Sequence, residues 1–151
     1  MNRIAVRLRR NGKQNGFTLV ELAIVIVIIG VLASFGVPRF RNAVERSKAG
    51  EAFAYLASIR AAQERYHART GSYATLVADL DVSMGTPKYF TIAEPAAGTC
   101  ADIEACWQMM LTRAGASAGY GAYTVTWTED GYSNDPLLST IEAIPAINPL
   151  S

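Results

Sequence analysis

The pattern of hydrophobic and polar residues divides the chain into a long apolar run, an amphipathic stretch and a mixed remainder. The apolar run covers residues 17–38, FTLVELAIVIVIIGVLASFGVP, and Glu21 is its only charged residue. A helix rises about 1.5 Å per residue, so this run would span roughly 33 Å, enough to cross the hydrocarbon core of a bilayer. A helix also satisfies its own backbone in lipid, so the many Ile and Val residues do not argue against one. The run therefore predicts a single transmembrane helix.

After the run the chain becomes polar, but its periodicity remains helical. Apolar residues recur at steps of three and four: Ala49, Ala52, Phe53, Leu56, Ile59, Ala62 and Tyr66. This spacing predicts that residues 39–70 continue the helix with one stripe buried beneath a globular head. Gly71 is well placed as the C-cap. Pro38 predicts a bend at the change of environment, because proline removes a helix hydrogen bond.

The head, residues 71–151, has the pattern of a small antiparallel sheet. Three stretches have strand-like composition or alternation, although the second is ambiguous with a helical turn: 88–92, 107–112 and 123–128. The alternation in the third predicts that its aromatic residues and Val125 face the helix and its threonines face water. A hairpin turn of the Asp-Gly type is expected at 129–132 and a short strand at 140–144. The predicted fold class is α+β, a long N-terminal helix packed on this sheet.

The charges in front of the apolar run orient it. Residues 1–16 contain five basic residues and no acid: Arg3, Arg7, Arg9, Arg10 and Lys13. Such a cluster stays on the cytoplasmic side of a membrane, so the N-terminus of the helix is expected inside. Without residues 1–16, nine basic side chains face thirteen acidic ones, a net charge of −4. Such a head has no general attraction for nucleic acid.

The junction between the basic segment and the apolar run carries a recognisable motif. The sequence Gly16-Phe17-Thr18-Leu19-Val20-Glu21 resembles the prepilin-peptidase site of type IV pilins and type II secretion pseudopilins. The resemblance covers residues 16 to about 48, and Pro38 matches a proline common in these proteins. It implies that residues 1–16 are a leader removed between Gly16 and Phe17, and that the new amino group of Phe17 is methylated. It also implies that Glu21 pairs with the Phe17 amine of the next subunit.

The physical case for a filament rests on Glu21. A carboxylate within the hydrocarbon of a membrane is costly, and such residues are normally paired and functional. Cleavage before Phe17 would create a cationic amino group a few residues away. An ion pair between subunits would then replace a lone carboxylate.

The resemblance implies a structural subunit of a type IV pilus-like filament. Its expected partners are copies of itself, the prepilin peptidase and the inner-membrane assembly platform. Before assembly it would be a single-pass inner-membrane protein, and afterwards part of an extracellular or periplasmic filament. A pseudopilin of a type II secretion system and a minor pilin are alternatives within the family. A monomeric membrane-anchored binding domain is an alternative from another class, but it leaves Gly16-Phe17 and Glu21 without explanation.

Other candidate chemistry lies in the head. Cys100 and Cys106 are expected to form a disulfide if the head lies outside the cytoplasm, the alternative being two buried thiols. Asp130, Asn134 and Asp135 are candidate calcium ligands resembling the calcium loop of major pseudopilins, although their spacing is not that of an EF-hand. Loops rich in such residues are usually just turns.

Catalytic motifs are missing from the sequence. His67 is the sole histidine, and no nucleophile-and-base pair, phosphate loop or zinc spacing accompanies it. The sequence therefore predicts neither an enzyme nor a resident cofactor.

Overall fold

The computed structural model describes residues 16–99, 102–115 and 119–151. One α-helix, α1 (Leu19–Thr70), is followed by four short strands: β1 (Phe90–Ile92), β2 (Gln108–Arg113), β3 (Thr124–Thr128) and β4 (Gly131–Tyr132). Two 3₁₀ turns, η1 (Val77–Asp79) and η2 (Thr140–Ala143), lie before β1 and after β4. The chain divides into two compact units, Met1–Val37 and Pro38–Ser151, and α1 contributes residues to both.

In the first unit, the part of α1 from Leu19 to Val37 is exposed at every position. By length and composition this is the one helix among the described residues that could cross a membrane. Its single hydroxyl, on Ser34, donates a hydrogen bond of 2.7 Å to the carbonyl of Val31. Apart from Glu21, the segment therefore presents an apolar surface on which the Ser34 hydroxyl already has a partner.

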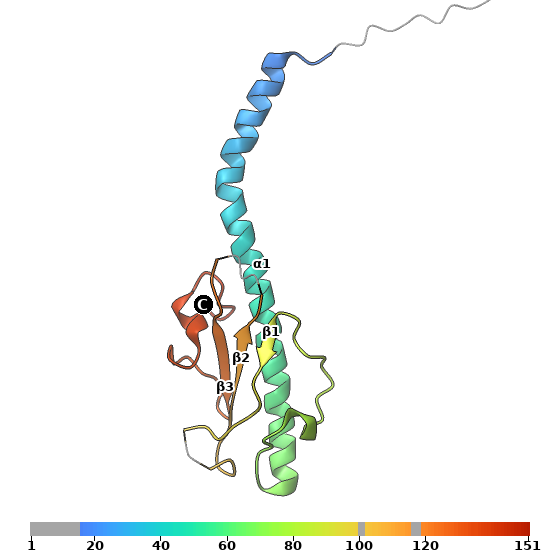
Figure 1. The fold of residues 1–151 in the computed structure, drawn as a ribbon, viewed down its shortest axis with the longest axis vertical. Coiled ribbons are helices and arrows are strands. Elements are labelled where there is room, and N and C mark those ends of the chain that lie inside the picture. The colour runs from blue at the N-terminus through green and yellow to red at the C-terminus, as the bar shows by residue number, and fades with distance from the viewer. Residues whose placement is uncertain (1–15, 100–101, 116–118) are drawn as a thin grey trace, which may run out of the picture. The chain divides into compact units, whose positions relative to one another are not determined.

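The second unit is a meander of strands packed on the amphipathic part of α1 (Figure 1). The strand order is β1-β2-β3-β4, with every neighbouring pair antiparallel. The helix stripe is buried against the inward side chains of the sheet, and its apolar members from Ala49 to Ala62 are at most 8% exposed. The predicted α+β fold is confirmed, and residues 107–112, ambiguous in sequence, are mostly strand.

The end of α1 is fixed by two sets of hydrogen bonds. Gly71 has φ 79°, which favours glycine, and its N–H donates to the carbonyl of His67 at 2.8 Å. The buried side chain of Gln63 forms two bonds with the backbone of Ala74, donating to its carbonyl at 2.9 Å and accepting from its N–H at 2.8 Å. These contacts fasten the chain after the helix against the face of α1.

The prediction that the threonines of β3 all face water is wrong. Thr126 is only 2% exposed. Its hydroxyl donates to the carbonyl of Leu138 at 2.7 Å, and its N–H donates to the hydroxyl of Ser139 at 2.9 Å. Thr124 likewise donates to the Leu138 carbonyl, at 3.0 Å. The threonines are thus the polar contacts that hold the C-terminal segment over the sheet.

Two local predictions after β3 are also corrected. Residues 140–144 contain the 3₁₀ turn η2 and not a strand. The backbone N–H groups of Thr124 and Thr140 each donate to the hydroxyl of the other residue, in place of the backbone carbonyls that a strand ladder would use. In the hairpin, Thr128 pairs with Gly131, so Glu129 and Asp130 form the loop and Gly131 begins β4. Gly131 has φ 118°, a conformation that side-chain-bearing residues rarely adopt.

A buried charge cluster joins α1 to the sheet. Glu45 is 0% exposed and Arg113 of β2 is 3% exposed. Arg113 donates from Nε to Glu45 Oε1 at 2.5 Å and from Nη2 to Oε2 at 3.3 Å. Tyr123 donates to Oε1 at 3.1 Å, and Lys48 donates to Oε2 at 3.2 Å. All of these bonds stabilise the charged form of Glu45.

The protonation of this cluster follows from its contacts. Burial alone would raise the pKa of Glu45, but hydrogen bonds from Arg113, Lys48 and Tyr123 outweigh it and hold the pKa below the ordinary value of 4.5. Glu45 in turn raises the pKa of Arg113. The pKa of Tyr123 is raised, first by burial and then by the charge of Glu45. The cluster therefore remains a carboxylate–guanidinium pair at neutral pH.

Candidate functional site

The junction at the start of α1 forms a capping box. Thr18 directly precedes the first helical residue, and the N–H of Glu21 donates to Thr18 Oγ1 at 3.2 Å. In return, the Thr18 N–H donates to Glu21 Oε2 at 2.8 Å. This reciprocal arrangement satisfies two backbone donors that a helix start leaves without partners. Sequence reasoning assigned no role to Thr18, although Thr-x-x-Glu before an apolar run is the signature of this cap.

The capping box leaves part of the Glu21 carboxylate open. The Thr18 hydroxyl also donates to Oε2, at 2.8 Å, so within the described residues both hydrogen bonds to this carboxylate end on the same oxygen. Among the described residues, Oε1 accepts no hydrogen bond. Glu21 thus has a structural role within a single chain and retains one oxygen for another donor. Phe17, next to the cap, is 82% exposed.

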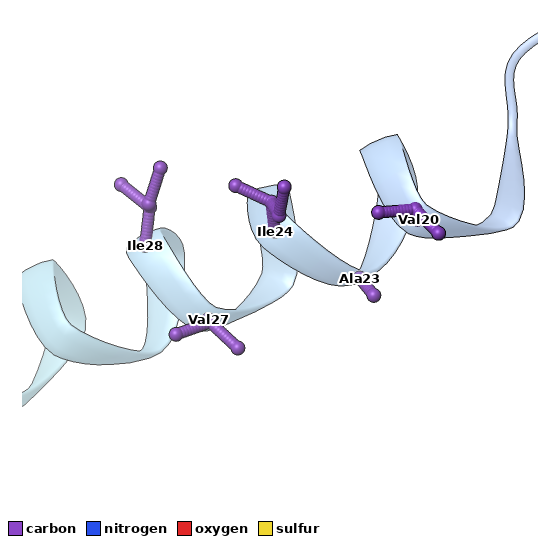
Figure 2. Close-up of a pocket in the computed structure, with 5 residues that line it drawn as sticks. All are labelled: Val20, Ala23, Ile24, Val27 and Ile28. Carbon is purple, nitrogen blue, oxygen red and sulfur yellow. The ribbon is translucent and has the colours of Figure 1, made fainter.

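The apolar surface beyond the cap has a shallow groove, lined by Val20, Ala23, Ile24, Val27 and Ile28. In Figure 2, Ile24 and Ile28 point to one side of the helix, and Ala23 and Val27 point to the other. The groove thus lies between rows of side chains four residues apart. Rows of this kind are the ridges that interdigitate when helices pack against one another.

At two glycines in the same segment, no contact within the described chain requires the absence of a side chain. A Cβ at Gly30 or at Gly36 would meet nothing within 4 Å. Small residues in membrane helices allow a second helix to approach closely. Pro38 lies inside α1 as the first residue of the second unit, and the bend expected there stays a prediction.

The candidate calcium ligands gain no support from their positions. Asp130 lies in the loop between β3 and β4, and Asn134 and Asp135 are exposed. Asp135 Oδ1 accepts a bond of 2.9 Å from the Leu137 N–H, the local turn that aspartate commonly makes. The described residues contain no group of three or more His, Cys, Asp or Glu side chains suited to a metal ion.

His67 makes structural contacts in the head. Its Nε2 lies 3.2 Å from the carbonyl oxygen of Glu104. Its ring stacks on that of Tyr73, with centroids 4.3 Å apart. The histidine therefore ties the loop before β2 to the end of α1.

Of the two cysteines, Cys100 lies outside the described residues and Cys106 is 3% exposed. The disulfide between them stays a prediction. Peptide mapping of the chain under non-reducing conditions should recover the two cysteines in one linked pair, with no thiol that alkylates. Reduction should cost on the order of 2 kcal/mol of stability, because the bridge closes only a short loop. Alkylatable thiols in the extracytoplasmic protein would contradict the prediction.

Comparison with known proteins agrees with the motif at the start of α1. The prokaryotic N-terminal methylation motif matches residues 11–37, which include Gly16, Phe17 and Glu21. The chain is also 43% identical over 58 residues to the fimbrial protein EcpC of Eikenella corrodens. It is 40% identical over 65 residues to the type IV major pilin protein PilA of Myxococcus xanthus (strain DK1622). Over its N-terminal segment, the chain is thus similar to type IV pilins and fimbrial proteins.

The similarity to these pilins is confined to part of each protein. The match to EcpC covers 38% of both chains, and the match to PilA covers 43% of this chain and 30% of PilA. The type IV major fimbrial protein FimA of Dichelobacter nodosus is 53% identical over 38 residues, which are 25% of this chain and 24% of FimA. The chain therefore matches between about a quarter and two fifths of these pilins.

Proposed function

We propose that the chain is a structural subunit of a type IV pilus-like filament, made as a prepilin and assembled through its N-terminal helix. One observation carries the proposal: a methylation motif over residues 11–37 coincides with a helix segment that is exposed throughout and uncharged except for Glu21. The similar proteins are a major pilin and fimbrial proteins, which favours a pilus subunit over a secretion pseudopilin.

The same helix surface would serve in two environments. Before assembly the segment from Leu19 to Val37 faces lipid, and after assembly it packs against the corresponding helices of neighbouring subunits. The groove beside Ala23 and the unfilled space at Gly30 and Gly36 are suited to such helix contacts. The remaining partners are the prepilin peptidase and the inner-membrane assembly platform.

Glu21 would supply the directed contact. The capping box fixes its Oε2, so Oε1 is free to accept the Phe17 ammonium of the next subunit. In hydrocarbon a lone carboxylate is costly, and a paired one with further hydrogen bonds is tolerated. This pairing makes assembly more favourable than the unassembled state in lipid. A monomeric anchored domain gives Glu21 only its capping role.

Electron microscopy of sheared surface filaments, with identification of their subunit by mass spectrometry, tests the proposal. We expect filaments that contain this chain and disappear when its gene is deleted. A chain that stays in the membrane while filaments lack it would overturn the proposal.

The cleavage site gives a separate prediction. Gly16→Val should block removal of residues 1–16, because a branched side chain crowds the bond to Phe17. Intact-mass measurement should find the variant still carrying the leader, whereas the wild type begins at Phe17 and carries one added methyl group. Gly30→Ala is the matched control, since its Cβ meets nothing within 4 Å, and it should be cleaved normally. A wild-type chain that retains residues 1–16 would contradict the prediction.

A further inference from the structure

Two arginines follow the apolar run without any partner in the described structure. Arg39 and Arg41 are exposed, and among the described residues neither makes a hydrogen bond or an ion pair. Phe40 between them is 71% exposed. This short basic and aromatic segment is fully available to a partner outside the chain.

No exposed acid neutralises these arginines nearby. Glu45 is the only acidic residue from 22 to 50, and it is buried in its pair with Arg113. Arg46, the next arginine along α1, donates to the carbonyls of Pro149 and Ser151 at 3.2 and 3.1 Å. The surface next to the end of the apolar run therefore carries uncompensated positive charge.

The arrangement around the helix indicates the kind of partner. Each residue advances an α-helix by about 100°, so Arg39 and Arg41 lie about 200° apart and point to opposite sides. A protein docking on one face of α1 would meet one of them. A layer of lipid headgroups surrounds the helix and would meet both. Arginines near the end of a membrane helix typically extend toward the headgroups at that depth.

We propose that Arg39 and Arg41 bind the phosphate groups of anionic phospholipids where the apolar run leaves the bilayer. Basic residues are disfavoured on the side of a membrane opposite a basic N-terminus, and anionic headgroups would offset that disadvantage. The proposal rests on membrane insertion of residues 17–38 and does not require filament assembly. The bound lipids would help to hold the unassembled subunit in the membrane at a defined depth.

Electron paramagnetic resonance of spin-labelled lipids tests this proposal on the full, unassembled chain. The chain is reconstituted in phosphatidylcholine vesicles with a trace of spin-labelled phosphatidylglycerol or spin-labelled phosphatidylcholine. The motionally restricted fraction of each label gives the relative association of the two lipids. We expect the wild type to associate more strongly with phosphatidylglycerol than with phosphatidylcholine. In Arg39→Gln/Arg41→Gln this preference should fall by about five-fold for each of the two arginines removed.

The control is Arg65→Gln/Arg69→Gln, which removes the same charge from exposed positions farther along α1. This control should leave the preference for phosphatidylglycerol unchanged. The basic residues of the leader are present in both variants, so their effect on lipid association is the same in each. Equal preferences in wild type and Arg39→Gln/Arg41→Gln would overturn the proposal, as would an equal loss in the control. The measurement uses the unassembled chain, so its result stands even if the chain does not form a filament.

Discussion

Glu21→Gln is expected to reduce filament yield by at least about a hundredfold while leaving membrane insertion and cleavage intact. Glutamine removes the charge that would pair with the Phe17 ammonium of the next subunit. Removing one partner of a buried ion pair typically lowers an equilibrium constant by two or more powers of ten, and in a filament the loss recurs at every subunit added. Insertion should be unimpaired, because the apolar run loses its only charge.

The capping box allows pairing to be separated from helix capping. Glutamine at position 21 can still accept the Thr18 N–H, as Glu21 does at 2.8 Å, since capping boxes use either residue. Glu21→Ala removes both functions, whereas Thr18→Ala weakens only the cap, at a typical cost of about 1 kcal/mol. We therefore expect Glu21→Gln and Glu21→Ala to fail in assembly and Thr18→Ala to assemble.

The measurement is filament yield set against membrane-bound, cleaved subunit in the same cells. Normal filaments from Glu21→Gln, with few from Thr18→Ala, would show that Glu21 acts as a helix cap and not as an ion-pair partner. If the helix served only as a membrane anchor, none of the three variants would change the filament yield.

Glu45→Gln should strongly destabilise the second unit, Pro38–Ser151. The substitution leaves the guanidinium of Arg113 buried, 3% exposed, without its carboxylate. Breaking a buried pair in this way typically costs about 3–5 kcal/mol. For a domain of this size, we expect the unfolding midpoint to fall by on the order of 15 °C. Thermal unfolding followed by near-ultraviolet circular dichroism measures the change.

A double variant distinguishes the orphaned charge from lost packing. Glu45→Gln/Arg113→Met removes the buried cation, so it should be more stable than Glu45→Gln alone. If the stability losses of Glu45→Gln and Arg113→Met simply add in the double variant, the broken ion pair is not the reason for the loss of stability in Glu45→Gln. Asp81→Asn is the exposed control, because its pair with Arg65 lies at the surface, and it should change stability little.

The same pair sets an acid dependence. The pKa of Glu45 is held below 4.5 by its hydrogen bonds from Arg113 and Lys48. Its contribution to stability is therefore fully present above pH 4.5 and is lost as the pH falls through the lowered pKa. The wild type should lose stability more steeply than Glu45→Gln in that acidic range.

The sequence predicts the elements well where one strong pattern decides them. The composition of the apolar run locates the first part of α1, and periodicity locates its buried stripe and the strand β3, because each pattern involves many side chains. The buried pair was missed, although its signals are present. Glu45 lies four residues before Ala49 on the stripe, and Arg113 follows Met109 and Leu111 on the inward side of β2. A charge on an apolar face indicates a partner, but the sequence does not say which.

The remaining errors come from contacts between segments far apart in the chain. Thr126 is buried only because Leu138 and Ser139 cross over it, which no local pattern predicts. The cap at Thr18 is local, and the pattern Thr-x-x-Glu before the apolar run is enough to identify it. The geometry of the helix start shows the capping role of Glu21, which substitutions can separate from the proposed ion pair.

The most direct test of the filament interpretation is a cryo-electron microscopy structure of the assembled filament at side-chain resolution. We expect the Phe17 amine of one subunit to lie within about 4 Å of the Glu21 carboxylate of its neighbour, the range of an ion pair. The neighbour's Thr18 should still cap its own helix. Glu21 bonded only to its own Thr18, with every Phe17 amine elsewhere, would show that this ion pair does not join the subunits.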